Sequence, residues 1–222
     1  MRRVMILSTV KSVYETFGNE LSRVCGGDVV IDNLLDTYLA DDPARHGGVF
    51  TSLNKQRLFH DLENLDMTKP DLIVVSCSTL SPYIPALRSF FATPIIAIDD
   101  AMCKAALAKG FRIAVLATAE SAIGPALDKL RMMGSEQGKK VSLQKLVDPK
   151  AIAALKAGDE EEHNRRILDM ARQVALGTDA IVLAQASMAG MQDQVKLLTG
   201  IPTFSSPVFC QQEVKHFLDS LR

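Results

Sequence analysis

The chain has 222 residues, of which 47% are hydrophobic and 23% charged, and its formal net charge is −1. A chain of this length can bury the core of one large domain or of two small ones. The near-neutral charge argues against a nucleic-acid or membrane-surface partner, and no apolar run reaches the ~20 residues that a membrane-spanning helix needs. The chain begins MRRVMILSTV, where the apolar stretch Val4–Leu7 is too short for a signal peptide and predicts a strand.

Short β-rich runs alternate with longer helical patterns along the chain. The candidate strands are Val4–Ser8, Val29–Asn33, Leu72–Ser76, Ile95–Ile98, Ile113–Ala117, Val141–Leu146, Ile181–Ala184 and Thr203–Ser205. The candidate helices are Val13–Cys25, Thr51–Leu65, Ile84–Phe91, Ala101–Lys109, Ser121–Met133, Asp159–Leu176, Met191–Leu198 and Val208–Leu221. Because the strands are apolar on both faces, this alternation predicts an α/β fold with mostly parallel sheets and crossover helices.

The two halves of the chain resemble each other in sequence. DLIVVSCSTLS, which starts at Asp71, aligns with DAIVLAQASMA, which starts at Asp179, at an offset of 108 residues. The same offset places Pro94 on Pro202. A third block repeats at an offset of 109 residues, since RVMILST at 3–9 aligns with RIAVLAT at 112–118.

Three blocks in the same order indicate an internal duplication, although buried strands of any α/β protein share composition. We therefore predict two pseudo-symmetric lobes that face each other across a cleft, each with a four-stranded sheet and flanking helices. The first lobe is expected to comprise residues 1–98 and 206–222, and the second residues 99–205.

Ligands of open parallel sheets bind beyond the carboxyl ends of the strands. Four segments at such predicted ends are rich in small polar residues. They are Ser8-Thr9, Ser76-Cys77-Ser78-Thr79, Ala117-Thr118-Ala119 and Gln185-Ala186-Ser187. In two lobes that face each other, these segments meet at one cleft.

Each of these segments precedes a predicted helix, whose first N–H groups are unpaired and favour an anion. The hydroxyls of Thr9, Thr79, Thr118 and Ser187 could complete a cradle for a small carboxylate. The alternative is that these Ser and Thr residues only cap their helices.

Cys77 lies at a predicted strand-to-helix turn. A thiol at a helix start can have a lowered pKa, and a thiolate can remove a proton from a carbon beside a carboxylate. Cys25, Cys103 and Cys210 fall in helical patterns and are expected to be small buried residues. The spacing of cysteine and histidine gives no zinc pattern, and we expect reduced thiols in a cytoplasmic protein.

On these residues the chain resembles the aspartate/glutamate/hydantoin racemase superfamily. The blocks that carry the resemblance are VVSCST at Val74–Thr79, PIIAIDDAM at Pro94–Met102, RIAVLAT at Arg112–Thr118 and IVLAQASMAGM at Ile181–Met191. The resemblance implies two flavodoxin-like lobes, each with one cysteine that moves a proton at the substrate Cα. It implies a small carboxylate substrate and neither cofactor nor metal, and by analogy a homodimer or higher homo-oligomer.

The chain departs from the family pattern at one of the two cysteines. The first family cysteine matches Cys77, whereas the second falls on Gln185, which Ala186 and Ser187 follow. An amide has no proton to exchange at a useful pKa. Gln185 is instead expected to hydrogen-bond a carboxylate or an amide of the substrate.

Three functions stay open on this pattern. The first is a racemase-like enzyme with Cys77 as acid or base. The second is a single-cysteine decarboxylase of malonate-type acids, in which Cys77 protonates the carbanion. The third is a small-anion binding protein without turnover.

Three further residues are candidates for a second base, namely Lys11, His46 and Asp100. His46 belongs to DDPARHGG, a stretch with Gly and Pro that we expect to form a loop and to cover the site as a lid. Asp99 is expected to cap the next helix. The acids of GDEEEHNRR at 158–166 predict an exposed helix start.

Overall fold

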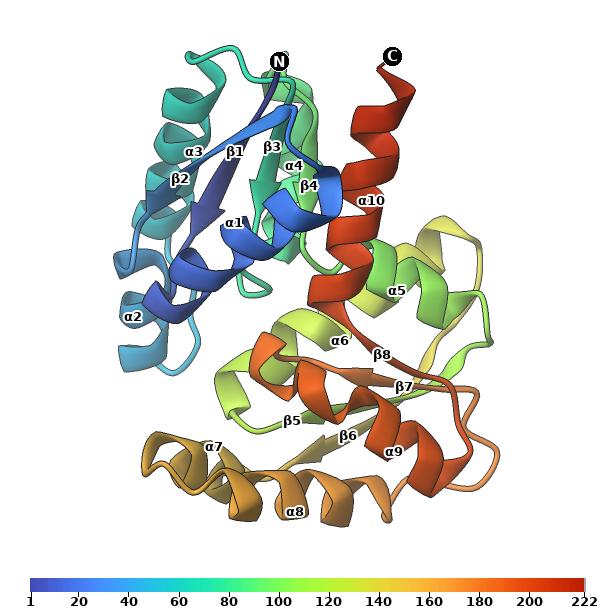
Figure 1. The fold of residues 1–222 in the computed structure, drawn as a ribbon. Helices are drawn as coiled ribbons and strands as arrows, with labels where there is room; N and C mark the ends of the chain where they lie inside the picture. Colours follow the sequence, from blue (N-terminus) through green and yellow to red (C-terminus); the bar gives the residue numbers. More distant parts are fainter. Residues whose placement is uncertain (222) are drawn as a thin grey trace. The chain divides into compact units, whose positions relative to one another are not determined.

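The computed structural model describes residues 1–221, drawn as a ribbon in Figure 1. Contacts between residues divide the chain into two compact units. Unit 1 comprises Met1–Ile98 and the chain from Val208 onward, and unit 2 comprises Asp99–Pro207. Each unit contains a four-stranded, all-parallel sheet with helices around it, which confirms the predicted α/β fold. No helix within residues 1–221 has the length and apolar character needed to cross a bilayer.

The sheet of unit 1 has the strand order β2-β1-β3-β4. Its strands are β1 (Arg2–Ser8), β2 (Val29–Leu35), β3 (Leu72–Val75) and β4 (Ile95–Ala97). Its helices are α1 (Lys11–Cys25), α2 (Tyr38–Arg45), α3 (Ser52–Asp66), α4 (Ile84–Leu87) and α10 (Ser206–Ser220). Short 3-10 helices at Ser81–Tyr83 and Arg88–Phe90 flank α4.

The sheet of unit 2 has the equivalent order, β6-β5-β7-β8. Its strands are β5 (Arg112–Ala117), β6 (Ser142–Val147), β7 (Ala180–Leu183) and β8 (Thr203–Ser205). Its helices are α5 (Asp100–Leu107), α6 (Glu120–Glu136), α7 (Pro149–Lys156), α8 (Glu160–Ala171) and α9 (Gln192–Thr199). A 3-10 helix at Ala186–Met191 precedes α9. Every predicted strand lies within two residues of its expected ends.

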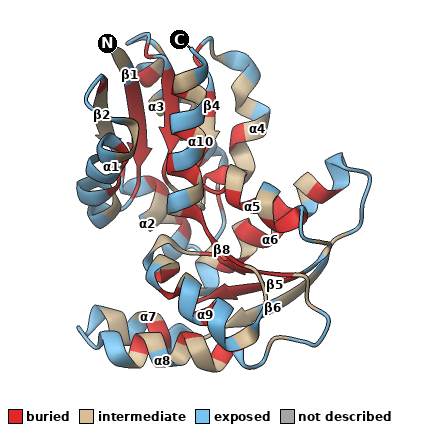
Figure 2. Cartoon of the chain, turned by 45° about the vertical axis from the view of Figure 1, so that its right-hand side comes forward, coloured by how far each residue is buried: buried red, intermediate tan, exposed pale blue. Residues whose placement is uncertain are grey.

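Strand β1, one of the two central strands of unit 1, contributes to two cores, one on each face of the sheet. Val4 and Ile6 pack with α1 and α10 on one face, whereas Met5 and Leu7 pack with α3 on the other. Successive side chains of a strand point to opposite faces, so a strand between two helical layers must be apolar throughout. Figure 2 shows the resulting burial of the strands.

The two units repeat a hydrogen-bonding pattern at the positions that the sequence blocks align. In unit 1, the Asp71 backbone N–H donates to Arg3 O, and the Asp71 side chain accepts from Arg3 N at 2.7 Å. In unit 2, Asp179 makes the same two bonds with Arg112, and its side chain accepts from Arg112 N at 3.0 Å. The aligned residues therefore have the same structural role in both units.

One helix of each unit follows the last strand of the other unit. α5 follows β4 but packs against α6, β7 and β8 of unit 2. α10 follows β8 but places Cys210, Val214 and Leu218 in a core of unit 1. Unit 1 is therefore built from two segments of the chain, whereas unit 2 is one continuous segment.

Two helices were not expected from the sequence. α2 includes DDPAR, the first half of the stretch predicted as a lid loop, and its first turn is supported by Asp36, which accepts a hydrogen bond from Tyr38 N at 3.1 Å. α7 begins where the Asp148 side chain accepts from Lys150 N at 2.9 Å, with Pro149 in the first turn. An acceptor followed by proline is a helix-start signal that the sequence does contain.

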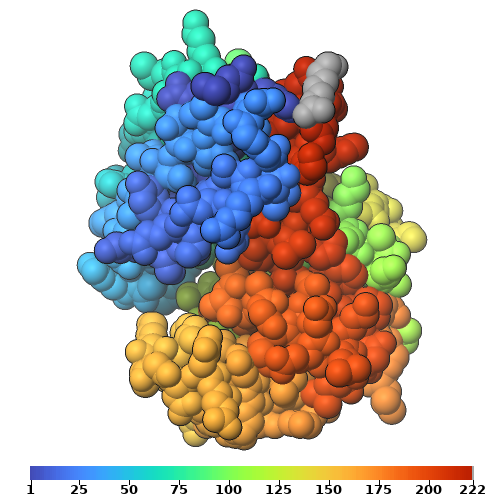
Figure 3. All heavy atoms as spheres, in the orientation of Figure 1, coloured from blue at the N-terminus to red at the C-terminus, as the bar shows by residue number. Residues whose placement is uncertain are grey.

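The acidic segment before α8 behaves as predicted. The Asp159 side chain accepts from Glu162 N at 3.0 Å, and Arg165 forms ion pairs with Glu162 and Asp169 at 2.8 and 2.7 Å. These residues lie in the amber segment that Figure 3 shows at the surface of unit 2. We interpret this face as solvated.

Replacing Leu218 of α10 by alanine is expected to destabilise the protein by about 2–4 kcal/mol, because the side chain is 1% exposed and its loss leaves a cavity in the core of unit 1. Urea denaturation measures the free energy of unfolding. Leu197→Ala is the control, since Leu197 is 88% exposed and its loss should change stability by less than about 0.5 kcal/mol. Equal effects of the two changes would contradict the packing of α10.

Candidate functional site

In unit 1, the connections after the two central strands leave toward opposite faces of the sheet. After β1, Phe17 and Leu21 of α1 pack on one face, whereas after β3, Leu80 and Ile84 pack on the other. Flavodoxin-like sheets with this strand order bind ligands beyond the carboxyl ends of these two strands. The equivalent point in unit 2 lies between β5 and β7.

Two serines join the central strand ends of unit 1. The Ser8 and Ser76 hydroxyls are hydrogen-bonded to each other at 2.9 Å, and Ser76 Oγ also lies 3.2 Å from Leu7 O. Both serines are buried. The Ser8 hydroxyl, predicted to bind substrate, therefore already has a partner and holds β1 against β3.

The Thr9 hydroxyl has no such partner. Thr9 is 3% exposed, and its Oγ1 is buried without a hydrogen-bond partner among the described residues. The N-cap of α1 is Val10, and within residues 1–221 no side chain caps this helix start, so Thr9 is not a capping residue. A buried hydroxyl without a partner costs about 1–3 kcal/mol, which favours a site where a ligand supplies one.

Cys77 follows β3 directly and carries a free, partly buried thiol. Its side chain packs against the core cluster on the α3 face of the sheet. The helix predicted at Ile84–Phe91 is not one continuous α-helix, because the segment from Ser81 to Phe90 forms two 3-10 helices around the four-residue α4. Pro82 and Pro85 provide no backbone N–H there, so a strong helix dipole cannot act on the thiol.

In unit 2, Gln185 is hydrogen-bonded to the start of α6. Its Oε1 accepts from Thr118 N at 2.7 Å, from Thr118 Oγ1 at 3.1 Å and from Ala119 N at 3.1 Å. Thr118 is fully buried, and Ala119 is the N-cap of α6. The structure thus brings three predicted site residues together, and the donors predicted to hold a substrate carboxylate instead bind a side chain of the protein.

The other predicted binding residues lie in the turns after β3 and β7. Ser78 and Thr79 are partly buried in the turn that follows Cys77. Ala186 is partly buried and Ser187 exposed at the start of the 3-10 helix after β7.

Each candidate for a second base already contacts another polar group of the protein. Lys11 is exposed and pairs with Glu15 at 3.7 Å. His46 is the exposed C-cap residue of α2, and its ring nitrogen lies 2.8 Å from Asp42 O. Asp100 lies 2.5 Å from the ammonium group of Lys129, a side chain that is 1% exposed.

Asp99 does occupy the N-cap position of α5, but within the described chain its side chain makes no capping bond. It lies 3.8 Å from the Lys129 ammonium group, which also pairs with Asp100. The acids at the start of α5 therefore neutralise a buried lysine of α6.

A pair of carboxyl groups near the end of β2 was not expected from the sequence. Asp36, whose N–H donates to Ser8 O, is buried and forms an ion pair with Arg57 of α3. Burial opposes the charge of Asp36, but hydrogen bonds from Arg57 and Asp61 hold its pKa below the ordinary value. Burial, and then the neighbouring Asp36, raise the pKa of Asp61 to about 7. Asp61 is therefore an acid that titrates near neutral pH.

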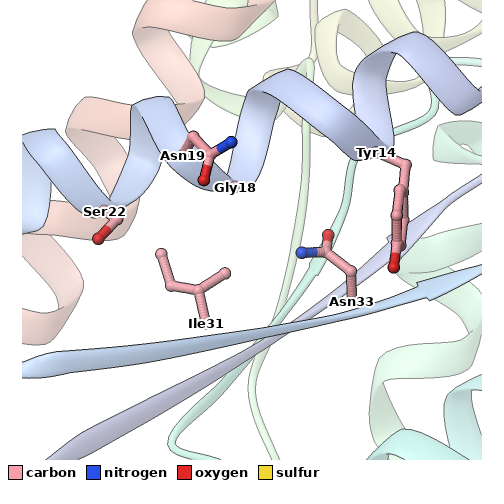
Figure 4. A pocket seen from close by; sticks show the side chains of 6 residues that line it. All are labelled: Tyr14, Gly18, Asn19, Ser22, Ile31 and Asn33. Carbon is pink, nitrogen blue, oxygen red and sulfur yellow. The ribbon is translucent and has the colours of Figure 1, made fainter.

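A separate hollow of about 170 Å³ lies between α1 and β2. Figure 4 shows the side chains around it, which include Tyr14, Asn19 and Asn33. None of the predicted site residues lines it. The described residues contain no group of three or more His, Cys, Asp or Glu side chains that could hold a metal ion.

The chain has two flavodoxin-like units with polar residues at their strand ends, and unit 1 carries a free thiol there. These features define a class of two-lobed α/β proteins that bind ligands beyond the carboxyl ends of their central strands. The family model of Asp/Glu/Hydantoin racemases matches residues 3–209, and the chain belongs to this family. The resemblance noted on four sequence blocks is thereby confirmed.

Solved structures of low sequence identity share the fold. Allantoin racemase from Klebsiella pneumoniae is 19% identical, with a TM-score of 0.67 over 100% of this chain and 89% of that one. Glutamate racemase isoform RacE1 from Bacillus anthracis is 15% identical, with a TM-score of 0.68 over 99% and 82%. Unliganded arylmalonate decarboxylase is 13% identical, with a TM-score of 0.57 over 98% and 93%. No curated protein matches the sequence.

Replacing Asp61 by asparagine is expected to make stability less dependent on pH. Because Asp61 keeps its proton to about pH 7 when folded but only to about 3.8 when unfolded, its contribution to the free energy of unfolding falls as the pH rises through this window. The asparagine side chain does not titrate, so at pH 8 the variant should be more stable than the wild type by roughly 1–3 kcal/mol.

Urea denaturation of both proteins from about pH 4 to 8 measures this difference. The control is Asp128→Asn, because Asp128 is an exposed partner of Arg131. Parallel pH profiles for Asp61→Asn and the wild type would contradict the raised pKa of Asp61.

Proposed function

We propose that the protein is a racemase-like isomerase that transfers a proton at the α-carbon of a small carboxylate, without a cofactor, and that Cys77 is the acid or base. Membership of the Asp/Glu/Hydantoin racemase family supports a racemase-like enzyme in general. The observation that carries the proposal further is the place of Cys77, a free and partly buried thiol directly after the central strand β3. The other described cysteines lie within helices.

The chemistry at this place is a proton transfer to and from sulfur. The Cys77 thiolate takes the α-proton, and the electron pair of the C–H bond moves into an enediolate of the substrate carboxylate. The buried Thr9 hydroxyl at the end of β1 is suited to donate a hydrogen bond to a carboxylate oxygen. For inversion, a water molecule on the opposite face of the carbon delivers a proton and leaves hydroxide, and the Cys77 thiol gives its proton to that hydroxide, which regenerates the thiolate.

Gln185 supports a second candidate, a decarboxylase. Its amide holds no exchangeable proton at a useful pKa, and its Oε1 is occupied by three donors. A single acid suffices where the C–C bond to a carboxylate breaks and CO₂ leaves with the electron pair retained on carbon. The Cys77 thiol then protonates the enediolate and recovers a proton from water.

Cys77→Ala is expected to lower exchange of the substrate α-proton by about 10²–10⁴-fold, because the acid–base group is removed. Proton NMR in D₂O, with a panel of small chiral carboxylates, follows the loss of the Cα–H signal. Cys25→Ser is the control, since Cys25 is a partly buried thiol within α1 and should leave the rate unchanged. Exchange that persists in Cys77→Ala would show that another group moves the proton.

The two candidate reactions differ in the product that they form in D₂O. A malonate with two different substituents at its central carbon should release CO₂ and give one enantiomer of the deuterated acid if Cys77 protonates one face. Chiral chromatography of the product measures this. No CO₂ release while α-proton exchange proceeds would rule out the decarboxylase, and CO₂ release with a racemic product would contradict protonation of one face by Cys77. Binding without either reaction would instead identify a small-anion binding protein.

A further inference from the structure

The bonds made by Gln185 fix the direction of its amide. Two of the three partners of Oε1 are backbone N–H groups, of Thr118 and Ala119, and these can only donate. The atom that faces the start of α6 is therefore the oxygen. Backbone N–H groups and a hydroxyl that converge on one oxygen are an arrangement that also binds a carboxylate or phosphate. We call Thr118 N, Thr118 Oγ1 and Ala119 N the unit 2 nest.

The matching position in unit 1 has no internal acceptor. Thr9 aligns with Thr118, and its Oγ1 is buried without a partner in the part of the chain that the structure describes. Cys77 aligns with Gln185, and a thiol is too short and too weak an acceptor to replace an amide oxygen. The donors at the unit 2 strand end are therefore hydrogen-bonded within the protein, whereas the Thr9 hydroxyl at the aligned unit 1 strand end is left for a ligand.

We propose that Gln185 is a specificity-determining residue that takes the place of a substrate carboxylate in the unit 2 nest. Ligands with a single anionic group are then favoured over dicarboxylates, which makes the malonate decarboxylase the less favoured of the two candidate reactions. This rests on the proposed function in that the ligand is a small carboxylic acid. A free carboxylate must displace an oxygen that is tethered to the same unit and therefore present at a high effective concentration. The remaining polar atom of Gln185, Nε2, is a donor and suits a neutral carbonyl oxygen of the substrate.

The first test asks whether the nest opens when Gln185 is removed. The amide signals of Thr118 and Ala119 are followed by NMR in the full-length protein while acetate is added. In the wild type they should not respond, and in Gln185→Ala they should shift to saturation. Gln144→Ala is the matched control, since the Gln144 side chain also bonds backbone groups of unit 2, Gln173 O and Ala175 N, but not the nest. Its Thr118 and Ala119 signals should not respond.

Either of two results would overturn the proposal. One is a saturable response to acetate in the wild type, and the other is no response in folded Gln185→Ala. Gln185→Glu keeps the proposal testable if the alanine variant does not fold. Its carboxylate would receive the same three hydrogen bonds, so its pKa should lie below the usual value of about 4.3. A glutamate pKa at or above that value would show that the nest does not favour an anion.

The second test concerns substrate class. Butanoate and succinate have the same number of carbons and differ by one carboxylate. By calorimetry, Gln185→Ala should bind succinate at least about tenfold more tightly than the wild type does, while butanoate affinity changes little. Wild-type protein that binds succinate about tenfold more tightly than butanoate would refute the restriction to one anionic group. These readouts do not involve Cys77, so a failure of proton transfer and a failure of the nest are distinguishable.

Discussion

The backbone N–H groups at the start of α6 need acceptors, and this requirement determines which polar atoms the strand ends of unit 2 can offer to a ligand. These groups have no partner within the helix, and α6 is not capped by a side chain of its own N-cap residue. Gln185 meets the requirement from the end of the neighbouring strand β7. A residue that satisfies the backbone in this way is not free to act on a ligand with the same atom. Under the proposed function, a glutamine at this position supplies no acid and also occupies the hydrogen-bond donors of the strand end.

The two units thus share a fold but differ in what their strand ends offer. Unit 1 presents a free thiol and an unpartnered buried hydroxyl, and its serines hold the two central strands together. Unit 2 presents a neutral amide whose oxygen is already bound. Matching strand orders and matching Asp–Arg backbone bonds support the predicted duplication. Under the proposed function, a single thiol at the strand end of unit 1 is consistent with chemistry on one face of a carbon.

The strands and their ends could be predicted because buried parallel strands are apolar on both faces, and the polar residues after them are conspicuous. The direction of a side chain could not be predicted, and the hydrogen bonds from Thr118 and Ala119 to the Gln185 oxygen were not expected. In the sequence, Asp61 cannot be distinguished from any other acidic residue of the predicted helix Thr51–Leu65. Its raised pKa depends on the packing of α3 against Asp36, which no local pattern encodes. α2 was not predicted, because Pro43 and the glycines after it are typical of a loop, and the support from Asp36 is visible only in the structure.

The reciprocal placement of α5 and α10 has a consequence for biosynthesis. During translation, the sheet of unit 1 leaves the ribosome long before the residues that cover the Val4 and Ile6 face. α1 covers part of that face early, but the rest stays uncovered until α10 has emerged, whereas unit 2 has all its own segments as soon as Pro207 has emerged. Unit 2 can therefore reach its native state first, and the thiol-bearing unit 1 is completed only after α10 has emerged.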